Sequence, residues 1–204
     1  SRALEVAEFA DVSCSAARAE NIIDTPQLIP NYWPVQLDAV HPDTDLITIS
    51  IGGNDSNSIF LGPLCVAPGP GTDRGCRYDP LANSVAQSGI DRAAGELDRI
   101  LTAVTQRAPN ARIYLIGEGG MISSRGCWPN IPFSDADASW FMDYFARYNT
   151  KFDEVATPTV CALSTLRRRA SPAGTTHVRV QISVGSKACS RSRRRNACTS
   201  RTLG

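Results

Sequence analysis

The sequence predicts an α/β fold built on a parallel sheet, and three segments carry that prediction. Residues 46–51 form a β-branched apolar run, LITISI, that ends at two glycines, as expected of a strand buried on both faces. Between Asp79 and Arg107, apolar residues recur at three- to five-residue intervals, which predicts an amphipathic helix. Residues 112–117, RIYLIG, supply a second buried strand. A strand, a helix and a strand of these lengths form a βαβ unit with parallel strands.

The remaining segments add fewer elements. We expect a short helix over Arg2 to Phe9, a strand or turn through Asp11 to Ser15, and a Pro-rich loop from Thr25 to Pro34. A further helix is predicted from Asp135 to about Thr157, with acidic residues near its start, where the helix dipole favours them. Its aromatic residues recur at helical spacing and are interpreted as core-facing rather than cofactor-binding: Trp140, Phe141, Tyr144, Phe145, Tyr148 and Phe152.

The length of 204 residues fits one domain with a substantial core. No run of 18 apolar residues is present in the sequence, which argues against a membrane-spanning helix. The first residues, SRALEVAEFADV, lack the charged-then-apolar layout of a secretory signal. We therefore expect that a signal was removed or that the true start is missing.

The net charge of +1 conceals an uneven distribution. Residues 1–155 contain all 20 acidic residues, whereas residues 156–204 contain ten Lys or Arg and no acid. This basic tail fits a nucleic-acid-binding arm or a charged disordered segment. We favour a third hypothesis, in which a GC-rich gene is read partly out of frame here; resequencing should then reveal an insertion or deletion near codons 155 to 190. Nucleic acid is the least favoured partner.

The seven cysteines indicate disulfides rather than a metal site, because no CxxC pair occurs and only two histidines are present. Such cysteine usage is typical of a secreted protein. Cys65 and Cys76 bracket a Pro/Gly loop that a local bridge would pin. The odd number leaves at least one cysteine without a partner within the chain, as a free thiol or because its partner lies in a missing segment.

The clearest chemical signal follows the first predicted strand. Reactive groups in parallel α/β sheets gather beyond the carboxyl ends of the strands, where Gly52-Gly53-Asn54-Asp55 lies. The glycines permit a sharp turn close to a ligand, and Asn54 can project an amide N–H donor. Alone, these four residues are also compatible with a plain turn.

The longer segment from Pro42 to Asp55, PDTDLITISIGGND, resembles the third sequence block of SGNH, or GDSL-type, hydrolases. Residues 11–17, DVSCSAA, resemble the second block, usually V-x-C-S-G-A. The chain is most similar to the branch of secreted actinomycete lipases and esterases. The resemblance implies a flavodoxin-like, three-layer α/β fold in which a parallel sheet of about five strands is flanked by helices. It covers residues 4–155 well and the tail poorly.

The resemblance also implies the disulfide pattern. Cys65 would pair with Cys76, Cys127 with Cys189, and Cys14 with a cysteine N-terminal to Ser1. Cys161 and Cys198 remain outside this pattern.

In this family a serine of a GDS motif attacks the ester carbonyl, and a histidine of a late DxxH motif is the base. Carried over to this chain, Asn54 is the side-chain donor to the oxyanion and Ala16 stands where a glycine supplies a backbone N–H. Alanine would be strained there if the backbone requires a positive φ. Gly53 and Asp55 would support the motif, Asp55 by bracing the loop.

The nucleophile and the base are missing from the sequence. No GDS or G-x-S-x-G motif occurs, and no DxxH follows the third block. Ser13 and Ser15 are interpreted as loop hydroxyls and His41 as a surface residue at the opposite end of the strand. His177 precedes Cys189, whereas the family's base follows that cysteine, so a catalytic role for His177 is disfavoured.

We therefore predict a secreted carboxylic-ester hydrolase domain over residues 1–155 that lacks its nucleophile block, followed by the tail. Its substrate would be an ester or lipid, with no cofactor and no metal, and a monomer is expected. The alternative is a non-catalytic binding module on the same fold. A nucleic-acid binder acting through the tail ranks last.

Overall fold

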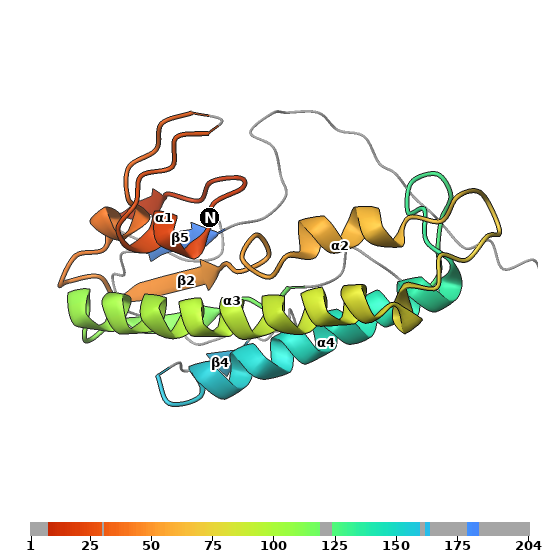
Figure 1. The fold of residues 1–204 in the computed structure, drawn as a ribbon. Helices are drawn as coiled ribbons and strands as arrows, with labels where there is room; N and C mark the ends of the chain where they lie inside the picture. Colours follow the sequence, from red (N-terminus) through yellow and green to blue (C-terminus); the bar gives the residue numbers. More distant parts are fainter. Residues whose placement is uncertain (1–7, 30, 119–123, 160–161, 164–178, 184–204) are drawn as a thin grey trace, which may run out of the picture.

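The computed structural model describes residues 8–29, 31–118, 124–159, 162–163 and 179–183. They contain one sheet of five parallel strands in the order β1-β5-β2-β3-β4 (Figure 1). The strands are β1 (Phe9–Asp11), β2 (Leu46–Ser50), β3 (Arg112–Leu115), β4 (Ala162–Leu163) and β5 (Arg179–Ser183). The predicted α/β class and parallel sheet are confirmed.

Strand β5 holds a central position in the sheet. It pairs with β1 on one side and with β2 on the other, in register from Leu46 opposite Arg179 to Ser50 opposite Ser183. In the flavodoxin-like strand order 2-1-3-4-5, the position between strands 2 and 3 belongs to the first strand of the fold. In this chain a late segment, from the region predicted as a basic tail, takes that position.

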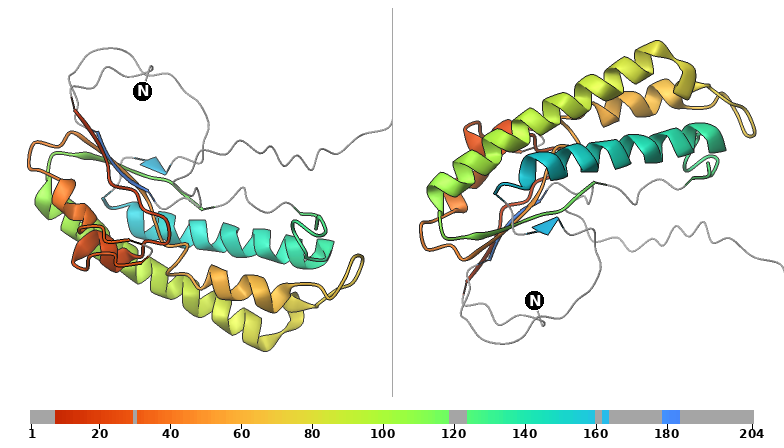
Figure 2. Two further views of the ribbon diagram at one scale, coloured as in Figure 1. Left: turned by 90° about the horizontal axis from the view of Figure 1, so that it is seen from above. Right: turned by 90° about the horizontal axis from the view of Figure 1, so that it is seen from below.

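Two long helices form the bulk of the helical layer. Helix α3 (Pro80–Arg107) begins after Asp79, whose side chain accepts hydrogen bonds from the backbone of Leu81 and Ala82. Helix α4 (Asp135–Ala156) begins after Ser134, whose hydroxyl accepts from the Asp137 N–H. Both caps satisfy backbone donors that a helix leaves open at its start. Figure 2 shows α3 and α4 side by side on one face of the sheet. Both helices match their predicted ranges closely.

Several shorter elements were not expected from the sequence. They are α1 (Ala19–Ile23), α2 (Ser58–Cys65) and the 3₁₀ turns η1 (Gln36–Ala39) and η2 (Cys76–Tyr78). The predicted helix from Arg2 to Phe9 is wrong at its end, because Phe9 belongs to strand β1, where backbone pairing with Arg179 overrides the local helical pattern. Residues 1–7 of that prediction lie outside the described residues.

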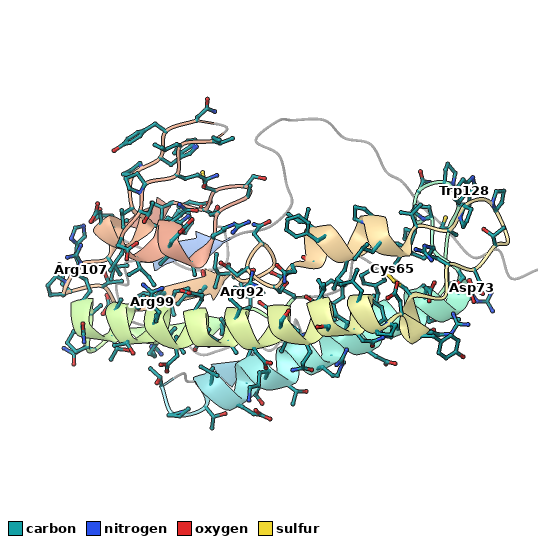
Figure 3. The ribbon with its side chains drawn as sticks, in the orientation of Figure 1. Cys65, Asp73, Arg92, Arg99, Arg107 and Trp128 are labelled. Atoms are coloured by element: carbon teal, nitrogen blue, oxygen red, sulfur yellow. A yellow bond between two sulfur atoms is a disulfide. The ribbon has the colours of Figure 1, made fainter. Side chains whose placement is uncertain are left out.

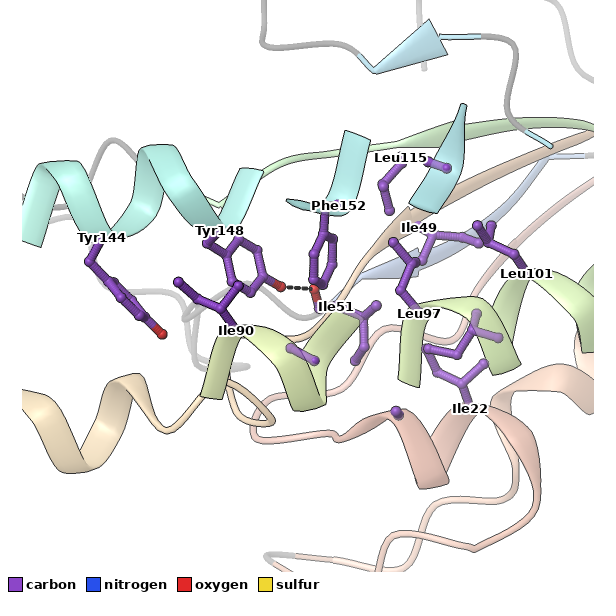
Figure 4. Packing of buried hydrophobic residues seen from close by; sticks show 14 of the residues in the cluster. Ile22, Ile49, Ile51, Ile90, Leu97, Leu101, Leu115, Tyr144, Tyr148 and Phe152 are labelled. Carbon is purple, nitrogen blue, oxygen red and sulfur yellow. Dashed lines mark hydrogen bonds between the residues drawn. The ribbon is translucent and has the colours of Figure 1, made fainter. Parts of the chain in front are cut away.

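The core lies between β2 and the two long helices. Figure 4 shows Ile49 and Ile51 of this core beside Leu97 and Leu101 of α3, with Tyr144, Tyr148 and Phe152 of α4. Ile47 and Phe141 are buried in the same cluster. The prediction of core-facing aromatics is confirmed for these four aromatic residues, and Trp140 and Phe145 pack at the margin of the core. Leu81 begins the apolar pattern between Asp79 and Arg107 that predicted α3, but its side chain is exposed. Within the described ranges, no helix has the length and apolar character needed to cross a membrane.

Candidate active site

The turn after β2 is shaped by backbone conformation and by two aromatic side chains. Gly52 has φ 104°, and its carbonyl accepts hydrogen bonds from the N–H groups of Asp55 (3.0 Å) and Ser56 (2.8 Å). A Cβ at position 52 would overlap the Tyr148 hydroxyl and the Phe152 ring. Glycine is therefore required here for both conformation and space.

Residues 52–56 are held in place from α3 and α4. The Tyr148 hydroxyl donates to the Ile51 carbonyl (2.9 Å; dashed in Figure 4), and the Tyr144 hydroxyl donates to the Ser56 carbonyl (2.9 Å). Burial raises the pKa of Tyr148 well above its ordinary value, so it stays a donor. On α3, a Cβ at Gly89 would overlap the Ser56 carbonyl. The turn therefore sits directly on both helices.

The segments that resemble the second and third family blocks are in direct contact. The Asn54 side-chain Nδ2 donates to the Ala17 carbonyl (2.9 Å). Both Asp55 carboxylate oxygens accept from the Ala19 N–H (3.3 Å each), at the start of α1. Burial raises the pKa of Asp55, an effect partly offset by the hydrogen bond from Ala19. Two segments some 37 positions apart are thus joined by adjacent side chains.

The backbone of the second block carries the strain that its alanine suggested. Ala16 is exposed and has φ 63°, in the left-handed region that favours glycine. Gln27 fixes the preceding residue, because its Nε2 donates to the Ser15 carbonyl (2.8 Å). The Ser13 hydroxyl donates to the Asp11 carboxylate (2.6 Å). Ala16 therefore lies between two anchored residues, Ser15, which is bonded to Gln27, and Ala17, which is bonded to Asn54.

One acidic residue at the carboxyl ends of the strands was not predicted from the sequence. Glu118 follows β3, and its backbone is clamped by Asn149, which accepts from the Glu118 N–H (2.9 Å) and donates to its carbonyl (2.6 Å). A Cβ on Gly53 would lie 3.3 Å from the Glu118 Oε1. Burial raises the pKa of Glu118 to about 7. The available signal was its position directly after the second predicted strand, at the same edge of the sheet as Asn54.

Comparison with known proteins identifies the family of this chain. The profile of the GDSL-like Lipase/Acylhydrolase family matches residues 2–180. The chain belongs to this family.

Three proteins similar to this GDSL-like chain come from Streptomyces. Over 191 residues it is 28% identical to Lipase 2 of Streptomyces coelicolor, covering 90% of this chain and 59% of that protein. The extracellular lipase of Streptomyces rimosus (TM-score 0.51, 18% identity) and phospholipase A1 of Streptomyces albidoflavus NA297 (TM-score 0.52, 16% identity) share its fold. Each alignment covers 72% of this chain and 56% of the other. The chain therefore spans little more than half the length of these proteins.

Two histidines and two serines of this GDSL-like chain remain to be located, and of these only the serines lie close to Asn54 within the described residues. His41 is exposed and precedes β2, at the amino end of the strand that carries Asn54 at its other end. His177 lies outside the described residues. The hydroxyls of Ser56 and Ser58 both donate to the Gly53 carbonyl (3.0 and 2.6 Å). The described part of the chain holds no cluster of three metal-ligating side chains.

One of the implied disulfides of this GDSL-like chain, Cys65–Cys76, lies within the described residues. Cys65 and Cys76 form a disulfide with a Cα–Cα distance of 5.3 Å. Cys127 is also disulfide-bonded, but Cys189, its predicted partner, lies outside the described residues, as do Cys161 and Cys198. Cys14 is half-buried beside Ser13 and Ser15.

Proposed function

We propose that this chain supplies the oxyanion-stabilising wall of a secreted carboxylic-ester hydrolase that works by serine acyl transfer. The observation that carries the proposal is the hydrogen bond from the Asn54 side chain, at the carboxyl end of β2, to the carbonyl of Ala17, the residue after Ala16. This is the edge at which α/β sheets gather reactive groups. The ester or lipid substrate is supported by the Streptomyces relatives, whose names are lipase and phospholipase A1.

The geometry leaves Asn54 able to act as a donor. Its side-chain nitrogen carries two hydrogens, and one is given to the Ala17 carbonyl. That bond fixes the plane of the amide, and the second hydrogen remains for a negatively charged oxygen. Asn54 is half-buried, so a ligand can reach it. Donors fixed in advance stabilise charge that develops only in the transition state, an effect of roughly 10²–10³ in rate for one donor.

The acyl-transfer steps require groups that the sequence does not supply. A serine oxygen would attack the ester carbonyl carbon and lose its proton to a histidine. The carbonyl oxygen would become the oxyanion, held by Asn54 and by the Ala16 N–H. Collapse would expel the alcohol, which takes the proton from the histidine, and water would then release the acid. Because nucleophile and base provide most of the rate at such sites, the chain alone should show little or no turnover.

Esterase assays on two forms of the protein test this proposal. The 204-residue chain should not hydrolyse a short-chain p-nitrophenyl ester above background. A form extended in the genomic frame to include an upstream GDS and a downstream DxxH should be active, and Asn54→Ala should lower its kcat by about 10²–10³. Asn110→Ala, in the exposed turn before β3, is the matched control and should leave kcat unchanged.

Two outcomes would overturn the proposal. Turnover by the 204-residue chain that is abolished in Asn54→Ala would show that the missing groups are not needed. Ester binding without turnover by the extended form would favour the alternative, a non-catalytic binding module on the same fold.

A further inference from the structure

Two uncharged segments next to the candidate active site hold apolar side chains out into solvent. The first is the loop of residues 25–34, where Leu28 is 69%, Ile29 80%, Tyr32 67% and Trp33 44% exposed. The second is the first turn of α2, where Ile59 is 62% and Phe60 61% exposed. We refer to these six residues as the apolar rim. Exposed apolar side chains that occur singly are ordinary, whereas groups of this kind mark contact surfaces.

The loop of the apolar rim is built rather than loose. The backbones of Gln27 and Trp33 exchange two hydrogen bonds (3.0 and 2.8 Å), which close the loop as a small hairpin. Gln27 is 6% exposed, and its Nε2 donates to the carbonyls of Ser15 and Ile29. A buried polar side chain therefore holds this loop in place. A surface that is held in its bound conformation loses less entropy when it binds.

Both segments of the apolar rim are tied to the candidate active site. Gln27 connects the loop to Ser15, directly before Ala16, and the Ser58 hydroxyl connects the first turn of α2 to the Gly53 carbonyl (2.6 Å). In Figure 1 the loop and α2 lie on the same side of α3, and the views of Figure 2 agree. Both segments of the apolar rim are therefore joined by hydrogen bonds to residues beside Asn54 and Ala16.

The chemistry of these segments points to one kind of partner. In a chain with 20% charged residues, residues 25–37 and 56–72 contain none. Tyr and Trp beside aliphatic residues are typical of surfaces that enter the boundary between water and lipid. A stable protein interface uses roughly 20–30 residues a side, far more than the six here.

We propose that the apolar rim docks the protein onto the surface of aggregated neutral or zwitterionic lipid, which presents ester bonds to the edge of the sheet at Asn54. The inference rests on the proposed ester hydrolase function for its biological meaning. The docking itself needs no hydrolysis, since the binding groups are apolar side chains outside the catalytic machinery.

Vesicle flotation of the 204-residue chain with phosphatidylcholine vesicles tests the docking directly. The protein should float with the vesicles, and raising NaCl to 1 M should not release it, because the contact is uncharged. Ile29→Ser and Phe60→Ser should each lower the partition coefficient about tenfold, as expected for the loss of one buried apolar side chain. The matched control is Leu81→Ser, at an equally exposed leucine (59%) in the first turn of α3, which should bind like the wild type.

Tryptophan fluorescence gives a second readout. Trp33 and Trp128 are each 44% exposed, but only Trp33 belongs to the apolar rim. Vesicles should shift the emission of the wild type and of Trp128→Phe to shorter wavelength, and this shift should be lost in Trp33→Phe.

Three outcomes would overturn the proposal. Binding that needs anionic lipid and falls with salt would assign membrane contact to the basic residues. Vesicle binding that is equal in Ile29→Ser, Phe60→Ser and Leu81→Ser would remove the apolar rim from the contact. A concentration-dependent dimer that Ile29→Ser abolishes, with no vesicle binding, would make a second copy of the chain the occupant.

The result is separable from the fate of the proposed function. In the extended form, Ile29→Ser should retain hydrolysis of a soluble short-chain ester. If the unsubstituted protein fails to dock on vesicles while soluble-ester hydrolysis is intact, the result counts only against the apolar rim. Absence of hydrolysis with docking intact counts only against the ester hydrolase.

Discussion

The two ends of helix α2 are stabilised in different ways. The turn of residues 51–56 precedes its amino end and is held by hydrogen bonds. Tyr144 and Tyr148 donate to carbonyls of the turn, and Asn54 of the turn donates to the Ala17 carbonyl. At the carboxyl end of α2, Cys65 is bridged to Cys76, and the adjacent Arg77 forms ion pairs with Asp73 (2.8 Å) and with the fully buried Asp137 (3.2 Å). Figure 3 shows Cys65 and Asp73 at this second end, close to Trp128.

The contrast follows from what each end must hold. The segments around the disulfide are mostly irregular, and links between side chains limit the conformational entropy that would oppose their order. Arg77 also holds the pKa of Asp73 well below its ordinary value. The segments at the candidate active site instead need particular backbone conformations, with positive φ at Gly52 and Ala16. The conformation at Gly52 persists because Tyr148 and Phe152 pack against it, and that at Ala16 because hydrogen bonds hold the carbonyls of its neighbours Ser15 and Ala17. Substitutions should therefore act on the two ends by different routes.

The largest effect on stability is expected in the turn of residues 51–56. Gly52→Ala places a methyl group against Tyr148 and Phe152 at a positive φ, and we expect a loss of about 4 kcal/mol in unfolding free energy. Gly95→Ala, in α3 with open space around it, is the control and should be stabilising by up to about 1 kcal/mol. Urea denaturation measures both. A loss below about 1 kcal/mol for Gly52→Ala would mean that the core does not dictate this turn.

The next effect concerns the disulfide end. Replacing Cys65 and Cys76 by alanine opens a short loop, and we expect a loss of about 3 kcal/mol. The turn of residues 51–56 should be unaffected, because neither Cys65 nor Cys76 takes part in the hydrogen bonds that hold it. The melting temperature measures the loss of stability. The fluorescence shift of Trp33 with vesicles reports on the region around Asn54. A double substitution that removes the vesicle response of the folded protein would show that the two ends depend on each other.

A smaller effect should depend on pH. The pKa of Glu118 is raised to about 7 in the fold, against an ordinary value of 4.5, because burial disfavours its charged form. The folded state therefore binds the proton more tightly than the unfolded state does. The stabilisation is complete below pH 4.5 and is lost as the pH rises through 7, about 2 kcal/mol after allowance for solvent near the carboxyl.

Glu118→Gln removes this dependence. Urea denaturation at pH 5 and pH 8 should show a smaller difference for the variant than for the wild type. Glu154→Gln, at an exposed carboxyl of α4, is the control and should retain the wild-type difference. An unchanged pH dependence in Glu118→Gln would place its source elsewhere in the fold.

The smallest effect tests the strain in the second block. Ala16→Gly should stabilise the fold by up to about 1 kcal/mol, since glycine adopts φ 63° without steric cost. Ala17→Gly, at a fully buried alanine, should destabilise it by about 1 kcal/mol. Thermal denaturation distinguishes the two signs, and destabilisation by Ala16→Gly would contradict strain at this position.

Local pattern predicted the regular elements of this chain well. The strand at 46–51, the strand at 112–117 and the two long helices are found within a few residues of their expected bounds. Helix α2 was missed because Gly62 and Pro63 interrupt its pattern, and α1 because five residues carry too little periodicity. Asn54 could be singled out from its motif. The position of Glu118 after a predicted strand was visible in the sequence, but its burial was not, since its surroundings depend on Gly53 and Asn149 from other segments.

The sequence by itself determined the family, the α/β class and the turn at Gly52-Gly53-Asn54-Asp55. Those properties are set by local residue order: apolar periodicity, glycines where the backbone must turn, and a motif read along the chain. Only the tertiary structure decided that Asn54 bonds to the Ala17 carbonyl, that tyrosines of α4 hold the turn, and that the two segments of the apolar rim are hydrogen-bonded to Ser15 and Gly53. These relations join segments far apart in the chain, and only packing of the core brings such segments together.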